Sequence, residues 1–198
     1  MSRGPIALRD VFDFFAYEKV RESMRRRVIE LKRARRVPVG PYLSFVFENR
    51  DTVLFQIQEM CRVERITDDA RIQDEIDVYS ALLPRRGELS ATLLIEIPEA
   101  PQIKPVLDRF MGLDTGTHVW IQVGKEFAVP GTFEAGHSDE EKGKLSAVHF
   151  VRFPFTPDAM RAFPTAAVFL AVDHAGSRAR TELGPETKAA LSEDLEGG

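Results

Sequence analysis

The residues best suited to binding chemistry follow a predicted strand that ends near Phe47. The segment Glu48–Thr52 combines carboxylates, an amide and a guanidinium where this strand passes into a helix. Backbone amides at a helix start can hold an anion, and the forked guanidinium of Arg50 could grip it. Gln56 and Glu59 continue the polar stripe at helical spacing. The ligand-binding residues predicted in this segment are Glu48, Asn49, Arg50, Asp51, Gln56 and Glu59.

The same segment also has a purely structural interpretation. Asn49 or Asp51 can act as the helix N-cap, while Arg50 pairs with a neighbouring carboxylate and the polar stripe is solvated. The carboxylates of Glu48 and Asp51 would also repel an anion bound at the helix start. The pattern leaves both interpretations open.

His149 is also predicted to belong to the ligand site. It lies in an extended segment predicted over 145–155, in phase with Val151 and Phe153, so it should occupy an apolar face. A neutral histidine hydrogen-bonded at the core and a histidine lining a pocket both fit this position.

His174 is the last residue predicted to belong to the ligand site, and it follows an apolar strand predicted over 167–173. It cannot pair directly with Asp173 within the strand, because adjacent side chains point to opposite faces. We expect His149 and His174 to share a hollow with the segment 48–59. An enzyme of unknown reaction that uses this hollow is one functional hypothesis.

A basic helix is predicted over 17–36, with nine Lys or Arg residues against three Glu residues, a balance of +6. We predict partner binding through Arg25, Arg26 and Arg33. A solvated face that pairs with acidic segments of the same protein is the alternative. Nucleic-acid binding is a weaker hypothesis, because aromatic residues do not interleave with the charges and the chain carries a net charge of −4.

Familiar metal and catalytic motifs are missing from the sequence. Glu134 and His137 have the Glu-x-x-His spacing, but Gly136 disfavours a helix there and the motif has no second copy. A single cysteine, Cys61, excludes an intrachain disulfide and a cysteine-built metal site. No metal site and no cofactor are therefore predicted, and whether the chain is an enzyme stays open.

The elements that must position these residues favour one α+β domain over residues 1–198. Helical and extended segments intermingle, so we expect a single mixed or mostly antiparallel sheet of four to six strands, with helices mainly on one face. Residues 183–198 should form a C-terminal helix and a frayed acidic tail. The apolar runs are too short to span a membrane, and residues 1–10 lack a secretory signal, so we expect a cytoplasmic protein.

Five segments resemble an uncharacterised bacterial family of unknown function. They are YEKVR (17–21), FENRDTVLFQIQEM (47–60), ATLLIEI (91–97), SAVHFVRF (146–153) and VDH (172–174). The resemblance implies a link to oxidative-stress physiology, through rubrerythrin-like or iron–sulfur proteins, and carries no catalytic residue. Our first hypothesis is therefore a non-catalytic accessory or ligand-binding protein, a homodimer that acts with a redox protein partner.

Overall fold

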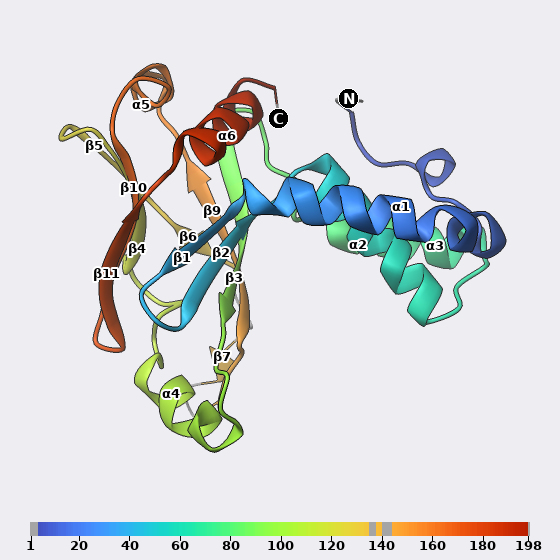
Figure 1. Cartoon of the computed structure of the whole chain (residues 1–198), viewed down its shortest axis with the longest axis horizontal. Coiled ribbons are helices and arrows are strands. Elements are labelled where there is room, and N and C mark those ends of the chain that lie inside the picture. Colours follow the sequence, from blue (N-terminus) through green and yellow to red (C-terminus); the bar gives the residue numbers. More distant parts are fainter. Residues whose placement is uncertain (1–3, 135–137, 140–143, 198) are drawn as a thin grey trace.

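Two antiparallel sheets face each other in a computed structural model that describes residues 4–134, 138–139 and 144–197 (Figure 1). Sheet A has the order β1 (Arg36–Val39), β2 (Leu43–Phe47), β3 (Glu88–Ile95), β9 (Val148–Pro154) and β6 (Thr132–Phe133). Sheet B has the order β11 (Ser177–Glu182), β10 (Val168–His174), β4 (Val119–Val123) and β5 (Phe127–Pro130). A separate ribbon pairs β7 (Ser138–Asp139) with β8 (Lys144–Leu145).

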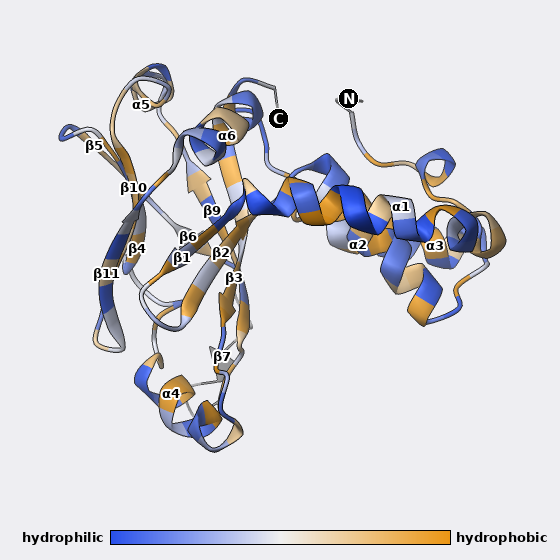
Figure 2. Cartoon of the chain, viewed as in Figure 1, coloured by the Kyte–Doolittle hydropathy of each residue, from blue (hydrophilic) through white to orange (hydrophobic). Residues whose placement is uncertain are grey.

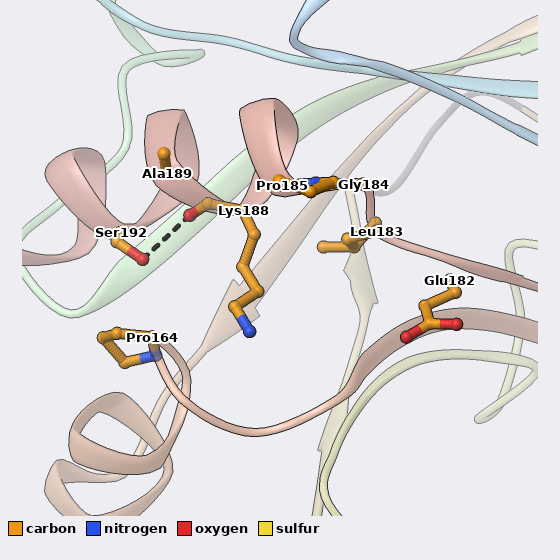
Figure 3. A pocket seen from close by; sticks show the side chains of 8 residues that line it. All are labelled: Pro164, Glu182, Leu183, Gly184, Pro185, Lys188, Ala189 and Ser192. Atoms are coloured by element: carbon orange, nitrogen blue, oxygen red, sulfur yellow. Dashed lines mark hydrogen bonds between the residues drawn. The ribbon is translucent and has the colours of Figure 1, made fainter.

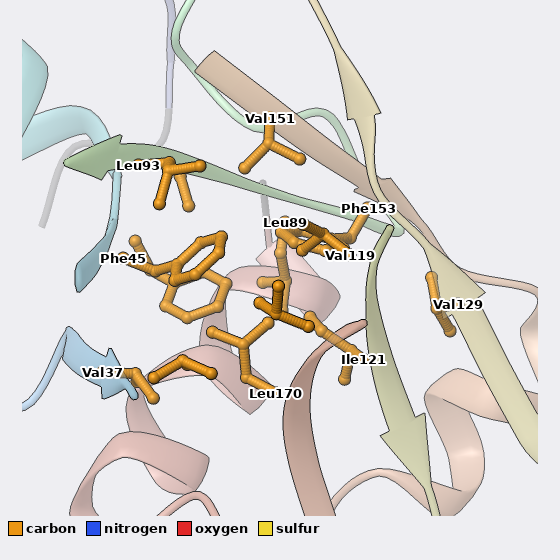
Figure 4. Close-up of a cluster of buried hydrophobic side chains, with 14 of the residues drawn as sticks. Val37, Phe45, Leu89, Leu93, Val119, Ile121, Val129, Val151, Phe153 and Leu170 are labelled. Atoms are coloured by element: carbon orange, nitrogen blue, oxygen red, sulfur yellow. The ribbon is translucent and has the colours of Figure 1, made fainter. Parts of the chain in front are cut away.

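The main core fills the space between the two sheets (Figure 4). Alternate residues of each strand point inward, as the period of two requires. Sheet A contributes Phe45, Leu93 and Phe153, and sheet B contributes Ile121 and Leu170; all are buried. The buried positions of Val151 and Phe153 confirm the apolar face expected for the segment 145–155.

The α+β class is confirmed, but the expected single sheet is wrong. Gly131 joins β5 of sheet B to β6 of sheet A, so the chain crosses between the sheets there. A Cβ at Gly131 would lie 2.8 Å from Val151 Cγ2 and 3.0 Å from Phe153 Cε1. Only glycine lets the backbone turn this corner so close to the core. The segment 130–145 contains the short strands β6, β7 and β8.

The helices are not gathered on one face. The helices α1 (Phe14–Arg33), α2 (Arg50–Val63) and α3 (Asp69–Ser80) form an arm that extends away from the sheets (Figure 1). In the same view, α4 (Ile103–Arg109) and α5 (Pro157–Ala162) lie at opposite ends of the sheets. Short 3-10 helices at Leu8–Asp10 and Ala100–Gln102 precede α1 and α4. No helix in the described part of the chain is both long and apolar enough to cross a membrane.

The arm has a hydrophobic cluster of its own. Its buried residues come from the N-terminal lead, α2, α3 and the segments that follow them: Ile6, Val53, Ile57, Cys61, Ile66, Ile72, Ile76 and Leu82. Phe150, on the outer face of β9, packs against this cluster and connects the arm to sheet A.

The C-terminal segment differs from the frayed tail that we expected. Helix α6 (Pro185–Gly197) continues through the acidic residues and buries Leu191 and Leu195. Asp194 forms a two-point ion pair with Arg35, with Nη1–Oδ2 and Nη2–Oδ1 distances of 2.5 and 3.0 Å. These contacts hold the last turns of α6 against the body of the protein.

Candidate functional site

The segment that follows β2 uses its polar side chains to build the start of α2. Asn49 is the N-cap and accepts a hydrogen bond from the Thr52 amide at 3.0 Å. Glu48, only 3% exposed, accepts hydrogen bonds from the hydroxyls of Thr52 at 2.5 Å and Thr92 at 2.7 Å. These two hydrogen bonds compensate for the burial of the Glu48 carboxylate, which thereby stabilises the connection between β2 and α2.

The next members of the segment contact other parts of the arm. Arg50 donates to Asp10 at 2.7 Å and to the Gly4 carbonyl at 2.9 Å, which ties down the N-terminal lead. Asp51 pairs with Arg27 of α1 at 3.0 Å. Burial raises the pKa of Tyr79 of α3, and Gln56, which interacts with the Tyr79 side chain, opposes this shift without cancelling it. The segment therefore has a structural role, but its partners differ from the expected ones. Arg50 pairs with Asp10 instead of a neighbouring carboxylate, and the polar stripe is bound to other helices instead of solvated.

Glu59 is the centre of a polar network that holds α1 on α2. Its carboxylate accepts hydrogen bonds from Tyr17 Oη at 2.6 Å and from Arg21 Nε and Nη2 at 2.8 and 2.9 Å. The Arg21 hydrogen bonds, with a smaller contribution from Tyr17, hold the pKa of Glu59 below its usual range, although burial opposes this shift. Burial, followed by the bond to Glu59, raises the pKa of Tyr17.

The structure does not bring His149 into a hollow with the segment 48–59. His149 pairs with Leu93 across β3 and β9, on the face toward sheet B, and is 1% exposed. Glu48 bonds to Thr92, the neighbour of Leu93, on the opposite face of sheet A. The expected shared hollow is therefore wrong: sheet A separates the two groups.

His149 is instead held inside the main core. Its Nε2 lies 2.7 Å from the Ser146 carbonyl oxygen, so this nitrogen carries the proton. Its Nδ1 lies 3.6 Å from Asp114 Oδ2. His149 thus confirms the prediction of an apolar face.

His174 lies beside a second histidine at the end of β10. The His174 and His118 rings are 4.7 Å apart between centroids and almost perpendicular. His174 Nδ1 accepts a hydrogen bond from the Gly176 amide at 3.0 Å. A Cβ at Gly176 would lie 2.6 Å from the Arg109 carbonyl oxygen, so glycine is needed where this turn meets α4. His174 and His149 both contact the segment 110–118, far along the chain from residues 48–59.

Acidification should destabilise the protein through His174. Burial, followed by the nearby His118, lowers the pKa of His174. The unfolded chain then binds the proton more readily, so the free energy of unfolding should fall as the pH drops below about 6.5 and level off below the folded pKa. Urea unfolding at several pH values should show a shallower pH dependence in His174→Asn than in the wild type. An unchanged pH dependence would contradict the role of His174.

The outer face of α1 is the part of the predicted site that is open to solvent. Arg25, Arg26 and Arg33 are all exposed. Arg26 Nε bonds to the Glu22 carbonyl at 3.3 Å, and Arg33 pairs with Glu30 at 3.0 Å on the surface. Figure 2 shows this helix as mostly hydrophilic, whereas the strands that enclose the core are largely hydrophobic.

Sequence reasoning missed two polar groups that the fold assembles. Arg35 was counted with the basic face of the first helix but is 4% exposed and bound to Asp194. His118 was not singled out, although it lies against His174. Both partners come from distant parts of the chain, so local spacing carries no signal for either pair.

A cavity of about 780 Å³ opens on the surface of the described residues at the start of α6 (Figure 3). Lys188 points into this cavity, but its Nζ already donates to the Ala166 carbonyl at 2.6 Å. A second cavity, about 310 Å³, lies where the α3–β3 connection meets sheet A.

Among the described residues, no three His, Cys, Asp or Glu side chains gather as metal ligands do; His137 lies outside this part of the chain.

Comparisons with known proteins agree with the resemblance in the sequence. A family model described as "Protein of unknown function (DUF3501)" matches residues 5–195. A crystal structure of a novel protein of unknown function from Burkholderia pseudomallei K96243 is similar, with 31% identity and a TM-score of 0.89. The match covers 98% of this chain and 100% of the other. No curated protein matches the chain.

Proposed function

Because the chain belongs to the DUF3501 family, whose description names no activity, we propose from its own surface that it is a non-catalytic binding protein that docks a partner through α1. The observation that carries the proposal is a ridge along α1, named here the α1 ridge, that faces solvent along its whole length. Its members are Phe15, Lys19, Glu22, Arg26, Ile29 and Arg33, and all of them are exposed.

The spacing and side chains of the α1 ridge suit contact with another helix. Steps of four and three residues alternate along it, which keeps its members on one face of α1. Phe15 is 77% exposed, which is unusual for a large aromatic side chain, and Ile29 is also exposed. Aromatic and aliphatic side chains on an accessible surface are typical anchors of protein interfaces.

The charges indicate an acidic protein as the partner. Arg21, Arg27 and Arg35 are used in ion pairs within the chain. Lys19 and Arg26 of the α1 ridge, together with Arg25 beside it, are exposed and would complement carboxylates on a partner helix. The internal ion pairs leave less charge for phosphates than the total of +6 suggests, and this favours a protein partner over nucleic acid.

The family resemblance supplies the first candidates for the partner. We propose a rubrerythrin-like or iron–sulfur redox protein, which would carry out the chemistry while this chain acts as its accessory protein. The proposal includes a bacterial cytoplasmic location, a role in oxidative stress and a homodimer. Native mass spectrometry of the complex purified from its own cells would report the stoichiometry and any metal held by the partner.

The test combines crosslinking with charge reversal. A photoreactive phenylalanine derivative at position 15 should crosslink to an acidic protein, whose purified form is then titrated against the full chain. Reversing Arg25, Arg26 and Arg33 to Glu should weaken binding about tenfold or more, and salt should weaken wild-type binding.

The matched control reverses three exposed cations of the same total charge at other places: Lys104, Lys125 and Arg161. This variant has the same net charge as the α1 variant and should bind almost as well as the wild type. Equal losses in both variants would show that overall charge, and not α1, governs binding, and the proposal would fail.

A further inference from the structure

The cavity of about 310 Å³ between the arm and sheet A has an ordered polar floor. Ser90 of β3 and Thr132 of β6 each pair with Arg152 of β9, so the three side chains form a row across adjacent strands. Directly paired residues on one face have Cβ atoms within about 5.5 Å of each other. This row lies on the outer face of sheet A, opposite the main core.

Arg152 is fixed in place by the protein itself. Its guanidinium bonds to Glu88 and to the carbonyl oxygens of Ala81 and Leu83, in the connection that follows α3. The cavity therefore has one rigid guanidinium, whose charge is balanced by Glu88.

Other hydrogen-bond donors at the cavity are not engaged. Ser90 is 3% exposed as a residue and lines the cavity, and its hydroxyl forms no hydrogen bond within the described part of the chain. Within the same part of the chain, the Thr132 hydroxyl and the Arg85 guanidinium also make no side-chain hydrogen bond. These groups line the cavity and can therefore donate hydrogen bonds to a ligand or to water inside it.

We propose that this cavity binds a small organic carboxylate. The carboxylate oxygens would accept hydrogen bonds from Ser90, Thr132 and Arg85, and Arg85 would supply the opposite charge. Leu82 and Phe150 provide apolar wall for the body of the ligand. The volume suits a molecule of amino-acid size.

The exposed carboxylate of Glu134 also lines the cavity. It should distinguish a simple carboxylic acid from an α-amino acid. It would repel a simple carboxylate slightly but would pair with the ammonium group of an α-amino acid. The shared chemistry is the carboxylate, and the experiment compares 4-methylpentanoate with leucine, which differ in the amino group.

Titration of the labelled full chain by NMR should show saturable shifts of the Arg85 and Ser90 amides with at least one of these acids. The Kd should be roughly millimolar or tighter. Ser90→Ala should weaken binding about tenfold, and Arg85→Gln should weaken it by a similar factor. Arg86→Gln is the matched control, because Arg86 is also exposed but does not line the cavity, and it should leave the Kd unchanged.

The methyl ester of 4-methylpentanoate has the same apolar body without the charge. Equal binding of the ester, an equal loss in Arg85→Gln and Arg86→Gln, or no saturable shift with either acid would overturn the proposal. Tighter binding of leucine that disappears in Glu134→Gln would support the amino-acid source. Equal affinity for both acids would support the carboxylate site without a role for Glu134. None of these outcomes depends on partner binding by α1.

Discussion

Replacing Asp194 by alanine should lower the free energy of unfolding by about 3–5 kcal/mol, the typical cost of leaving one charge of a buried pair without its partner. Arg35 is 4% exposed, and Asp194 supplies both acceptors of its two-point contact. For a chain of this length the loss corresponds to a fall in Tm of roughly 10 °C or more. Thermal and urea unfolding of Asp194→Ala and the wild type measure it.

Glu30→Ala is the control for Asp194→Ala. It breaks the Arg33–Glu30 pair, in which both side chains are exposed, and should change stability by less than about 1 kcal/mol. Similar losses in the two variants would contradict the importance that we assign to burial.

Replacing both partners should be far less harmful than replacing one. Burial raises the pKa of Asp194, and the opposing effect of Arg35 does not cancel that shift. The pair therefore does not fully compensate for its own desolvation. Arg35→Met combined with Asp194→Leu should recover most of the stability lost in Asp194→Ala.

Replacing Glu59 by glutamine should release α1 from α2. Only Tyr17 and Val28 of this 20-residue helix are buried, so its attachment depends strongly on the polar network. The substitution removes the charge that Arg21 contacts through two nitrogens and weakens the acceptor for Tyr17. We expect a loss of roughly 2 kcal/mol, which is about a 30-fold fall in hydrogen-exchange protection of the α1 amides.

Exchange in the strands of the main core should change much less than exchange in α1. Glu22→Gln is the control, because Glu22 is exposed and lies 3.7 Å from Arg21. The lowered pKa of Glu59 means that its stabilising effect is complete above about pH 4.3 and is lost as the pH falls through the folded pKa. Unchanged α1 protection in Glu59→Gln would show that apolar contacts alone hold this helix.

The strands with clear alternation could be predicted from the sequence, and the two-sheet arrangement could not. The alternation in β3 and β9 indicates which side chains face a core, but it does not indicate which sheet each strand joins. Strand β11 has the polar sequence SRARTE and was missed, since at the edge of sheet B it needs little apolar surface. Strand β1 contains Pro38, which is tolerated because β1 is also an edge strand.

The candidate site was predictable only where contacts are local. The N-cap role of Asn49 and the apolar environment of His149 follow from short-range patterns, and the structure confirms both. The separation of His149 from Glu48 depends on strand register, because adjacent residues on β3 point to opposite faces. Arg35 and Asp194 are 159 residues apart, so their pairing emerges only from the complete fold.

At Gly131 the chain runs directly from β5, at one edge of sheet B, into β6, at one edge of sheet A, so these two edges are covalently connected. On the other side, β1 and β11 are neighbours, and the described hydrogen bond across their border runs from the Thr181 hydroxyl to the Pro38 carbonyl at 2.5 Å. Proline offers no amide to extend a ladder there. When force or heat separates the two sheets, the separation should therefore start between β1 and β11. The sheets should stay together longest at Gly131, where the chain crosses from one to the other.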